Sequence, residues 1–353
     1  MGKAISVSSI PRCRDAAPSL WPLEAEQEPL LSPPYANKST VPTKKGPILL
    51  SFEEAPHWLQ DNEYILSGYR RPNQSVTDCI ASLTYVHNET ANIYTHMIPG
   101  LFLVVGEILL YQNFLSFYPE ATEADRLVFA SLLFAALICM SFSTAYHTLM
   151  SHSHSVSRLW LQMDYLGIMA LILGNILTGT YMVFYCIPHL IWLYWGTVID
   201  TPGFIQLDFL PLLINYLVLI EQTLTLGSLS CMIILHPKLQ GQEWRNFRTG
   251  TFACTGLSSL APLAHATLMF GLSGMFEHSG LPYYLLEGLL HITGVFFYAT
   301  RIPESLNPGQ FDIWFSSHQI FHVLAVLATV AQVFGVWHAF DYNYTNGLAC
   351  DAS

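Results

Sequence analysis

The chain has 353 residues, of which 52% are hydrophobic and only 11% are charged. Soluble proteins carry charge on about 25% of their residues, so this composition indicates an integral, multi-pass membrane protein of the plasma membrane or an endomembrane. The formal net charge of -11 argues against the basic surface that nucleic-acid binding requires, and we expect no nucleic-acid partner.

The N-terminal part of the chain differs in composition from the rest. Residues 1–78 contain Pro, Ser and charged residues and few long apolar runs, which is typical of disorder. We therefore expect a disordered cytoplasmic tail over 1–78, a membrane domain over 79–340 and a short outer tail over 341–353. Residues 57–95 mix aromatic and charged residues, which favours a short interfacial helix before the first membrane span.

A membrane-spanning helix needs roughly 20 mostly apolar residues. Six segments have this length and character: 97–118, 127–149, 160–184, 249–271, 282–300 and 313–338. The segment 187–235 holds two apolar stretches with Asp200 and Asp208 between them, so it contains either one span with an insertion or two spans. An insertion would cover 199–221 and could be genuine or an artefact of the gene model.

The distribution of basic residues decides between these span counts, because Lys and Arg are retained on the cytoplasmic side. With seven spans and a cytoplasmic N-terminus, only Arg126 lies in an outer loop, while the inner loops hold Arg158, Lys238, Arg245, Arg248 and Arg301. We therefore predict an all-α integral membrane protein, a bundle of seven transmembrane helices with an extracellular or luminal C-terminus. The glycosylation pattern at Asn343 would then lie outside.

Ionisable residues inside spans usually mark function, and here several lie at one depth. The second predicted span ends at His147, and the seventh begins with His318 and His322, whose spacing places both imidazoles on one helix face. Zinc accepts three His nitrogens and keeps its fourth position for water in catalytic sites. We predict that His147, His318 and His322 bind Zn2+.

Two polar residues near these histidines are candidates for catalysis. Asp164 lies in the first turns of the third span, where it could accept a proton from zinc-bound water. Ser143 precedes His147 by one turn and could hydrogen-bond the water or a developing oxyanion. The alternative is a closed structural site in which Asp164 is the fourth ligand.

Other buried polar residues have simpler interpretations. His265 and His291 lie deeper in their spans and are expected to form interhelical hydrogen bonds, and Glu107 in the first span is ambiguous. The seven cysteines lack CxxC pairs, so we expect no disulfide scaffold or thiolate zinc site and interpret most of them as small core residues.

The chain resembles the progestin and adipoQ receptors over about residues 65–340. The resemblance rests on three motifs in the family's order: Asn88, Glu89, Asn92, Ile93, Tyr94, Thr95 and His96; Ser143, Ala145, Tyr146, His147, Thr148, Ser157, Arg158, Asp164, Tyr165, Gly167 and Ile168; and Tyr298, Ala299, Arg301, Ile302, Pro303, Glu304, Asn307, Pro308, Gly309, Phe311, Asp312, Ile313, Trp314, Ser317, His318, Gln319, Ile320, Phe321, His322 and Val323. The most similar subgroup contains the adiponectin-receptor-like and haemolysin-III-related members.

This resemblance implies a seven-helix bundle with zinc held by His147, His318 and His322, and Asp164 near the zinc-bound water. It also implies a lipid-sized cavity open to the inner leaflet, a receptor function and, in some members, ceramidase-like activity. Ser305 departs from the family's usual Arg, and the surplus segment 199–221 interrupts the fourth helix.

We therefore expect a zinc-binding membrane receptor that hydrolyses the amide bond of a ceramide-like lipid bound in the bundle. Its partners would be that lipid or a fatty acid, and an extracellular protein or steroid ligand. The alternative is a receptor or a regulator of metal or lipid homeostasis in which zinc is structural and no catalysis occurs. A channel is less consistent with the sequence, because the polar residues gather at one depth instead of lining a path.

Overall fold

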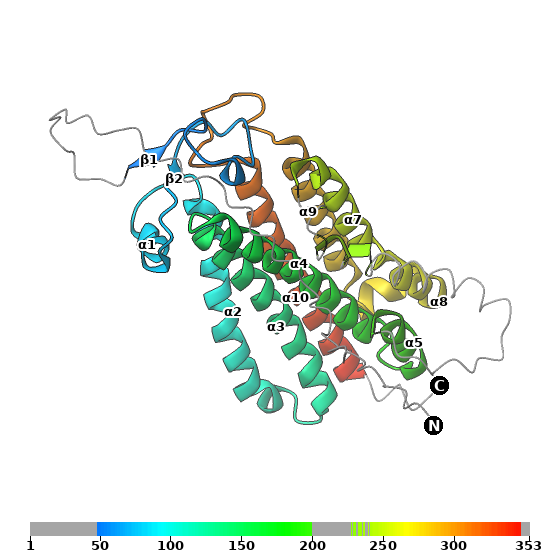
Figure 1. Cartoon of the computed structure of the whole chain (residues 1–353). Coiled ribbons are helices and arrows are strands. Elements are labelled where there is room, and N and C mark those ends of the chain that lie inside the picture. The colour runs from blue at the N-terminus through cyan, green and yellow to red at the C-terminus, as the bar shows by residue number, and fades with distance from the viewer. Residues whose placement is uncertain are drawn as a thin grey trace, which may run out of the picture. The chain divides into compact units, whose positions relative to one another are not determined.

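A computed structural model describes residues 48–199, 227, 229–230, 232–234, 236, 239 and 241–346 (Figure 1). Its helices include five segments long and apolar enough to cross a membrane: Thr90–Phe117, Glu123–Leu149, His154–Val183, Gln242–His278 and Ser317–Asn346. The predicted tail up to residue 47, the predicted insertion beyond residue 199 and the chain end from residue 347 lie outside the described residues.

Three long helices follow one another along the chain: α2 (Thr90–Phe117), α3 (Glu123–Leu149) and α4 (His154–Val183). Helix α3 begins with a capping box, in which Thr122 and Asp125 each accept a hydrogen bond from the other's backbone N–H. Its other face packs closely on α4, because a Cβ at Gly174 would lie 2.6 Å from the Ala135 Cβ. Small residues thus bring the two helices that carry His147 and Asp164 together.

The later helices are α5 (Pro188–Ile199), α7 (Arg245–Leu257), α8 (Leu260–His278), α9 (Leu281–Thr300) and α10 (Ser317–Asn346). A short 3-10 helix, η4 (Gln242–Trp244), precedes α7, and Gly271 interrupts α8 with a φ of 71°. Helix α10 packs against α9, α2, α4 and α3. This central position places the start of α10 beside the end of α3 (Figure 1).

The chain before α2 departs from the predicted disordered tail. Residues 48–78 contain a two-stranded antiparallel sheet of β1 (Leu49–Leu50) and β2 (Tyr69–Arg70), a 3-10 helix η1 (His57–Leu59) and the start of α1 (Val76–Ala81), which η2 (Ser82–Thr84) follows. The tail prediction is therefore wrong for this stretch.

Long-range contacts explain why composition misled the prediction for residues 48–78. Ala55, Leu59, Ile65 and Tyr69 pack against Met150 of α3 in one apolar cluster. The Asp312 carboxylate accepts hydrogen bonds from the Leu66 N–H at 2.9 Å and the Ser67 hydroxyl at 2.6 Å. Met150 and Asp312 lie far from residues 48–78 in the sequence, so the composition of this segment alone does not predict either contact.

The far end of the bundle gives two further corrections. Residues 341–346, which we assigned to the outer tail, belong to the last turns of α10. The Asn343 amide donates to the Met182 and His278 carbonyls at 3.2 and 3.4 Å, and these bonds hold the helix end against α4 and α8. Cys186, just beyond α4, is disulfide-bonded, whereas Cys79 and Cys139 are buried and free as expected.

Candidate metal centre

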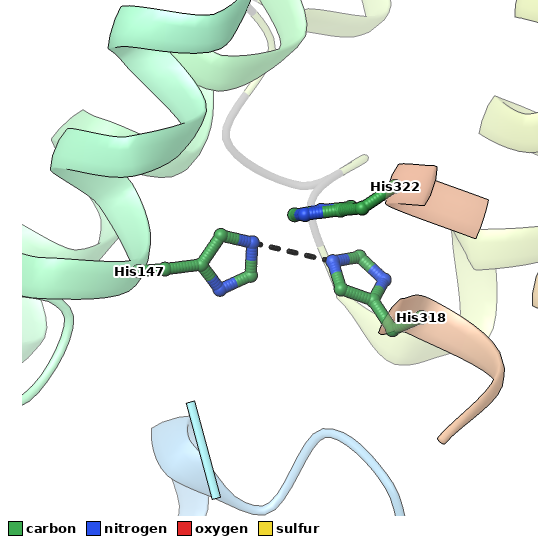
Figure 2. A group of neighbouring side chains, drawn as sticks. All are labelled: His147, His318 and His322. Carbon is green, nitrogen blue, oxygen red and sulfur yellow. Dashed lines mark hydrogen bonds between the residues drawn. The ribbon is translucent and has the colours of Figure 1, made fainter. Parts of the chain in front are cut away.

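Three histidine side chains from two helices meet inside the bundle. His147 lies in the last turn of α3, while His318 and His322 lie in the first turns of α10. Each offers a ring nitrogen within 4.8 Å of the other two, and the Nε2 atoms of His147 and His318 are 3.3 Å apart (Figure 2). The predicted proximity of these three residues is therefore confirmed.

The second nitrogen of two of these rings is already engaged. His147 Nδ1 lies 2.8 Å from Glu89 Oε2, and His322 Nδ1 lies 3.1 Å from the Asn92 carbonyl. Both acceptors require Nδ1 to carry the proton, which leaves each Nε2 with a free lone pair. Metal-bound histidines show this pattern, in which a carboxylate or carbonyl orients the ring from behind. The donor set therefore fits a metal ion.

Among the described residues, Glu89 is the carboxylate that is hydrogen-bonded to the triad, through His147. Burial favours its neutral form, but hydrogen bonds from His147 and Asn92 and the positive charge of Arg70 prevail and lower the pKa of Glu89 to about 2. Glu89 is therefore ionised at neutral pH. Its negative charge strengthens the hydrogen bond to His147 and raises the basicity of the opposite ring nitrogen.

Arg70 fixes the end of α3 that carries His147. Its buried guanidinium donates hydrogen bonds to the His147 and Thr148 carbonyls and to the Ser82 hydroxyl. The carbonyls of a helix's last turn have no partner within the helix, so this cation both satisfies them and complements the helix dipole. Strand β2 thereby positions the backbone of a metal-ligand candidate.

Asp164 lies on α4 and lines a cavity of about 460 Å³ together with Glu89, His147 and His318. Asp164 is not one of the three residues whose ligand atoms converge, and the cavity lies beside those residues. Ser143 lies beside the Asp164 side chain. Its hydroxyl is buried beside that carboxyl group, close enough for a hydrogen bond between the two side chains.

The same cavity has basic residues on its wall. Arg245 lies over the Tyr298 ring at 4.2 Å, and Arg248 lies over the Tyr165 ring at 5.5 Å. Trp58 from the segment before α2 also lines this space. The cavity therefore combines aromatic, basic and acidic groups next to the histidines, a surface suited to the polar part of an amphipathic molecule.

Several residues that support the three histidines were not predicted from the sequence to do so. Glu89, Asn92 and Arg70 support the histidines, and the His96 ring stacks on the His322 ring with centroids 3.7 Å apart. Glu89 directly precedes an apolar span. Its position at the same depth as His147 was the sequence feature that could have predicted this contact. Asn92 acts through its backbone carbonyl, which no side-chain pattern reveals.

The interhelical hydrogen bonds predicted for His265 and His291 are confirmed for only one of the two residues. His265 Nδ1 lies 2.9 Å from the Tyr194 hydroxyl, so the predicted interhelical hydrogen bond is confirmed. His291 instead approaches Glu287 of its own helix, with 3.7 Å between Nε2 and Oε1. The interhelical bond predicted for His291 is therefore not what the structure shows.

The fold and the site define a helical, multi-pass membrane protein with a buried group of three histidines. The sequence profile of the Haemolysin-III related family matches residues 84–333. This match includes all three triad residues, and the chain belongs to that family.

Individual relatives carry receptor names. The chain is 34% identical over 285 residues to "Adiponectin receptor protein" of Drosophila melanogaster, covering 81% of this chain and 58% of the relative. It is 33% identical to "ADIPOR-like receptor IZH2" of Saccharomyces cerevisiae, covering 83% and 84% of the two chains. It is 30% identical to "Progestin and adipoQ receptor family member 3" of Homo sapiens, covering 80% and 83%. The chain thus spans little more than half of the Drosophila protein's length.

Proposed function

We propose that this protein is a zinc-binding membrane receptor of the adiponectin-receptor-like type that hydrolyses the amide bond of ceramide-like lipids. The observation that carries the proposal is the convergence of three His nitrogens while His147 and His322 are held from behind by Glu89 and the Asn92 carbonyl. The receptor names of the relatives support the receptor part of the proposal.

Zinc is the metal that suits this donor set. Three neutral imidazoles with an open fourth position are typical of catalytic zinc sites. When bound, zinc polarises a carbonyl and lowers the pKa of a coordinated water toward about 7. The proposal thus assigns the ligand role to His147, His318 and His322.

The chain's own residues supply the remaining parts of an amide hydrolysis. Asp164 faces the cavity and would accept a proton from the attacking water, then return it to the leaving amine. Ser143, whose buried hydroxyl lies beside Asp164, would donate a hydrogen bond to the oxyanion. Water and the amide are converted to a fatty acid and a sphingoid amine, so the atoms balance without another reactant.

We also propose seven spans with a cytoplasmic N-terminus. His147 lies at the end of α3 and His318 at the start of α10, and the two Nε2 atoms are 3.3 Å apart. Contact at this distance requires an even number of crossings between the two helices. One span within 187–235 satisfies that condition, whereas two spans would put the residues on opposite sides of a core about 30 Å thick.

The experiment that tests the function combines metal content with turnover. Purified full-length protein in detergent is expected to contain about one zinc per chain and to release fatty acid from a short-chain ceramide, with loss of activity after chelation. Full zinc occupancy without turnover would instead support the second candidate, a receptor with a structural zinc, which the relatives' receptor names also fit. Absence of zinc would contradict both.

A further inference from the structure

A second group of polar side chains lies inside the bundle, away from the metal centre. We call Asn175 of α4, Tyr284 and Glu287 of α9 and Gln332 of α10 the inner polar cluster. Asn175 Nδ2 donates to Glu287 Oε1 at 2.6 Å, and Gln332 Nε2 donates to the Asn175 carbonyl at 3.3 Å. Tyr284 precedes Glu287 by about one helical turn. The cluster thus joins three helices.

The cluster contains buried oxygen atoms that the described residues leave unpaired. Asn175 Oδ1, Gln332 Oε1 and the Tyr284 hydroxyl are buried and have no partner among the described residues. Gln332 is 1% exposed and Tyr284 is 7% exposed. The amide N–H groups of both Asn175 and Gln332 point to partners within the bundle. Buried oxygens without a donor are costly, so this arrangement calls for a positively charged or donating ligand.

The carboxyl group of Glu287 also favours a positively charged ligand in this cluster. Its side chain is 16% exposed, and the nearest basic group is His291 Nε2 at 3.7 Å, beyond hydrogen-bond distance. Within the described part of the chain, Glu287 has no ion pair with Lys or Arg. An ionised carboxylate in this setting needs a compensating charge nearby, and without one burial favours the protonated, neutral carboxyl group.

We propose that the inner polar cluster binds a sodium ion through the carboxylate of Glu287 and the amide oxygens of Asn175 and Gln332. Hard cations prefer carboxylate, amide and hydroxyl oxygens. A monovalent ion balances the single carboxylate, whereas a divalent ion would leave a net positive charge in the bundle interior. The ion would tie α9 to α4 and α10.

This site is separate from the metal centre. Gln332 lies ten residues after His322 on the same helix, which corresponds to about 15 Å along the axis of α10. The proposal therefore does not depend on zinc or on amide hydrolysis. Its failure would leave the proposed function untouched.

The test measures the thermal unfolding of the purified full-length protein in detergent at constant ionic strength. Sodium chloride is titrated against choline chloride, with potassium chloride as a second comparison. A ligand at ten times its dissociation constant should raise the melting temperature by roughly 3–5 °C, and the rise should saturate with sodium concentration. Equal melting temperatures in sodium and choline chloride, or an equal effect of potassium, would overturn the proposal.

Two variants and one control assign the effect to the cluster. Glu287→Gln keeps an oxygen that accepts from Asn175 and should abolish the sodium-dependent rise. Gln332→Met removes one oxygen at nearly constant volume and should shift the sodium titration to about tenfold higher concentration; it decides the question if Glu287→Gln does not fold. Glu107→Gln, at another partly buried carboxylate on α2, should respond to sodium like the wild type. A sodium response retained in Glu287→Gln would overturn the assignment.

Discussion

At the scale of single residues, His147 uses its two ring nitrogens for different purposes. Nδ1 faces Glu89 at 2.8 Å and Nε2 faces the other histidines, so the carboxylate determines which nitrogen is free for a metal. The same division holds for His322 with the Asn92 carbonyl. Three residue-level predictions follow from this geometry and from the position of Asp164.

Replacing His318 with Ala is expected to reduce zinc from about one ion per chain to nearly none. His318 is one of three converging ligands, and the two remaining nitrogens cannot hold the ion tightly. Metal analysis by mass spectrometry measures the content. His291→Ala serves as the control, because His291 lies on α9 and is not part of the triad. Unchanged zinc in His318→Ala would end the three-histidine assignment.

Replacing Glu89 with Gln is expected to weaken zinc binding about 10–100-fold, the usual effect of losing a carboxylate that orients a ligating histidine. The amide can still accept from His147 Nδ1, but it carries no negative charge. Competition with a fluorescent chelator measures the dissociation constant. A dissociation constant equal to that of the wild type would show that the Glu89 charge does not act on the ligand.

Replacing Asp164 with Asn is expected to keep zinc and lower ceramide hydrolysis by roughly 10² to 10⁴, because an amide cannot accept the proton. Zinc content and fatty-acid release are measured on the same preparation. Loss of zinc in this variant would favour the closed structural site, in which Asp164 is a ligand. Full zinc with wild-type hydrolysis would remove Asp164 from both mechanisms.

At the scale of elements, the segment from β1 to β2 closes one side of the cavity and braces α3. Arg70 in β2 binds the last carbonyls of α3, and the turn before β2 is bound by Asp312 from the loop between α9 and α10. The segment therefore connects the end of α3 with the loop before α10, the two helices that carry the triad. Its stability depends on partners at a sequence separation of 246 residues.

Replacing Asp312 with Ala is expected to destabilise the docking of this segment by about 1.5–3 kcal/mol, because two hydrogen bonds to a charged group are lost. Limited proteolysis should then cut between residues 48 and 72 faster than in the wild type. Glu63→Ala is the matched control, since the Glu63 side chain is 66% exposed and its nearest approach to Arg301 is 3.8 Å. Equal cleavage rates in Asp312→Ala and wild type would contradict the bracing role.

At the scale of the whole molecule, the span count decides whether the triad can form. His147 and His318 touch only if the chain crosses the membrane an even number of times between α3 and α10. In the proposed topology, with one further crossing by each of α2, α3 and α10, the two ends of the chain would lie on opposite sides. An even span count would therefore contradict both the proposed topology and the proposed metal site.

A reporter fused after Ser353 is expected to read as extracellular or luminal, and one fused before Met1 as cytoplasmic. Two cytoplasmic readings would mean an even span count and would contradict the shared depth of His147 and His318.

Asn343 is not a suitable marker, because its amide nitrogen is hydrogen-bonded to the Met182 and His278 carbonyls. We expect Asn343 to remain unglycosylated in the folded protein, which gel mobility after glycosidase treatment would check.

The sequence by itself was sufficient for the membrane class, for most of the apolar helices and for the three histidines of the centre, but not for the division of the predicted span 249–271 between α7 and α8. These features depend on local composition and on spacing along one helix, such as the i, i+4 pair His318 and His322. The tertiary structure alone decided that residues 48–78 are ordered, that Glu89 supports His147 and that Glu287 meets Asn175. Each of these depends on side chains brought together from distant parts of the chain, and hydropathy and helical spacing carry no information about such contacts.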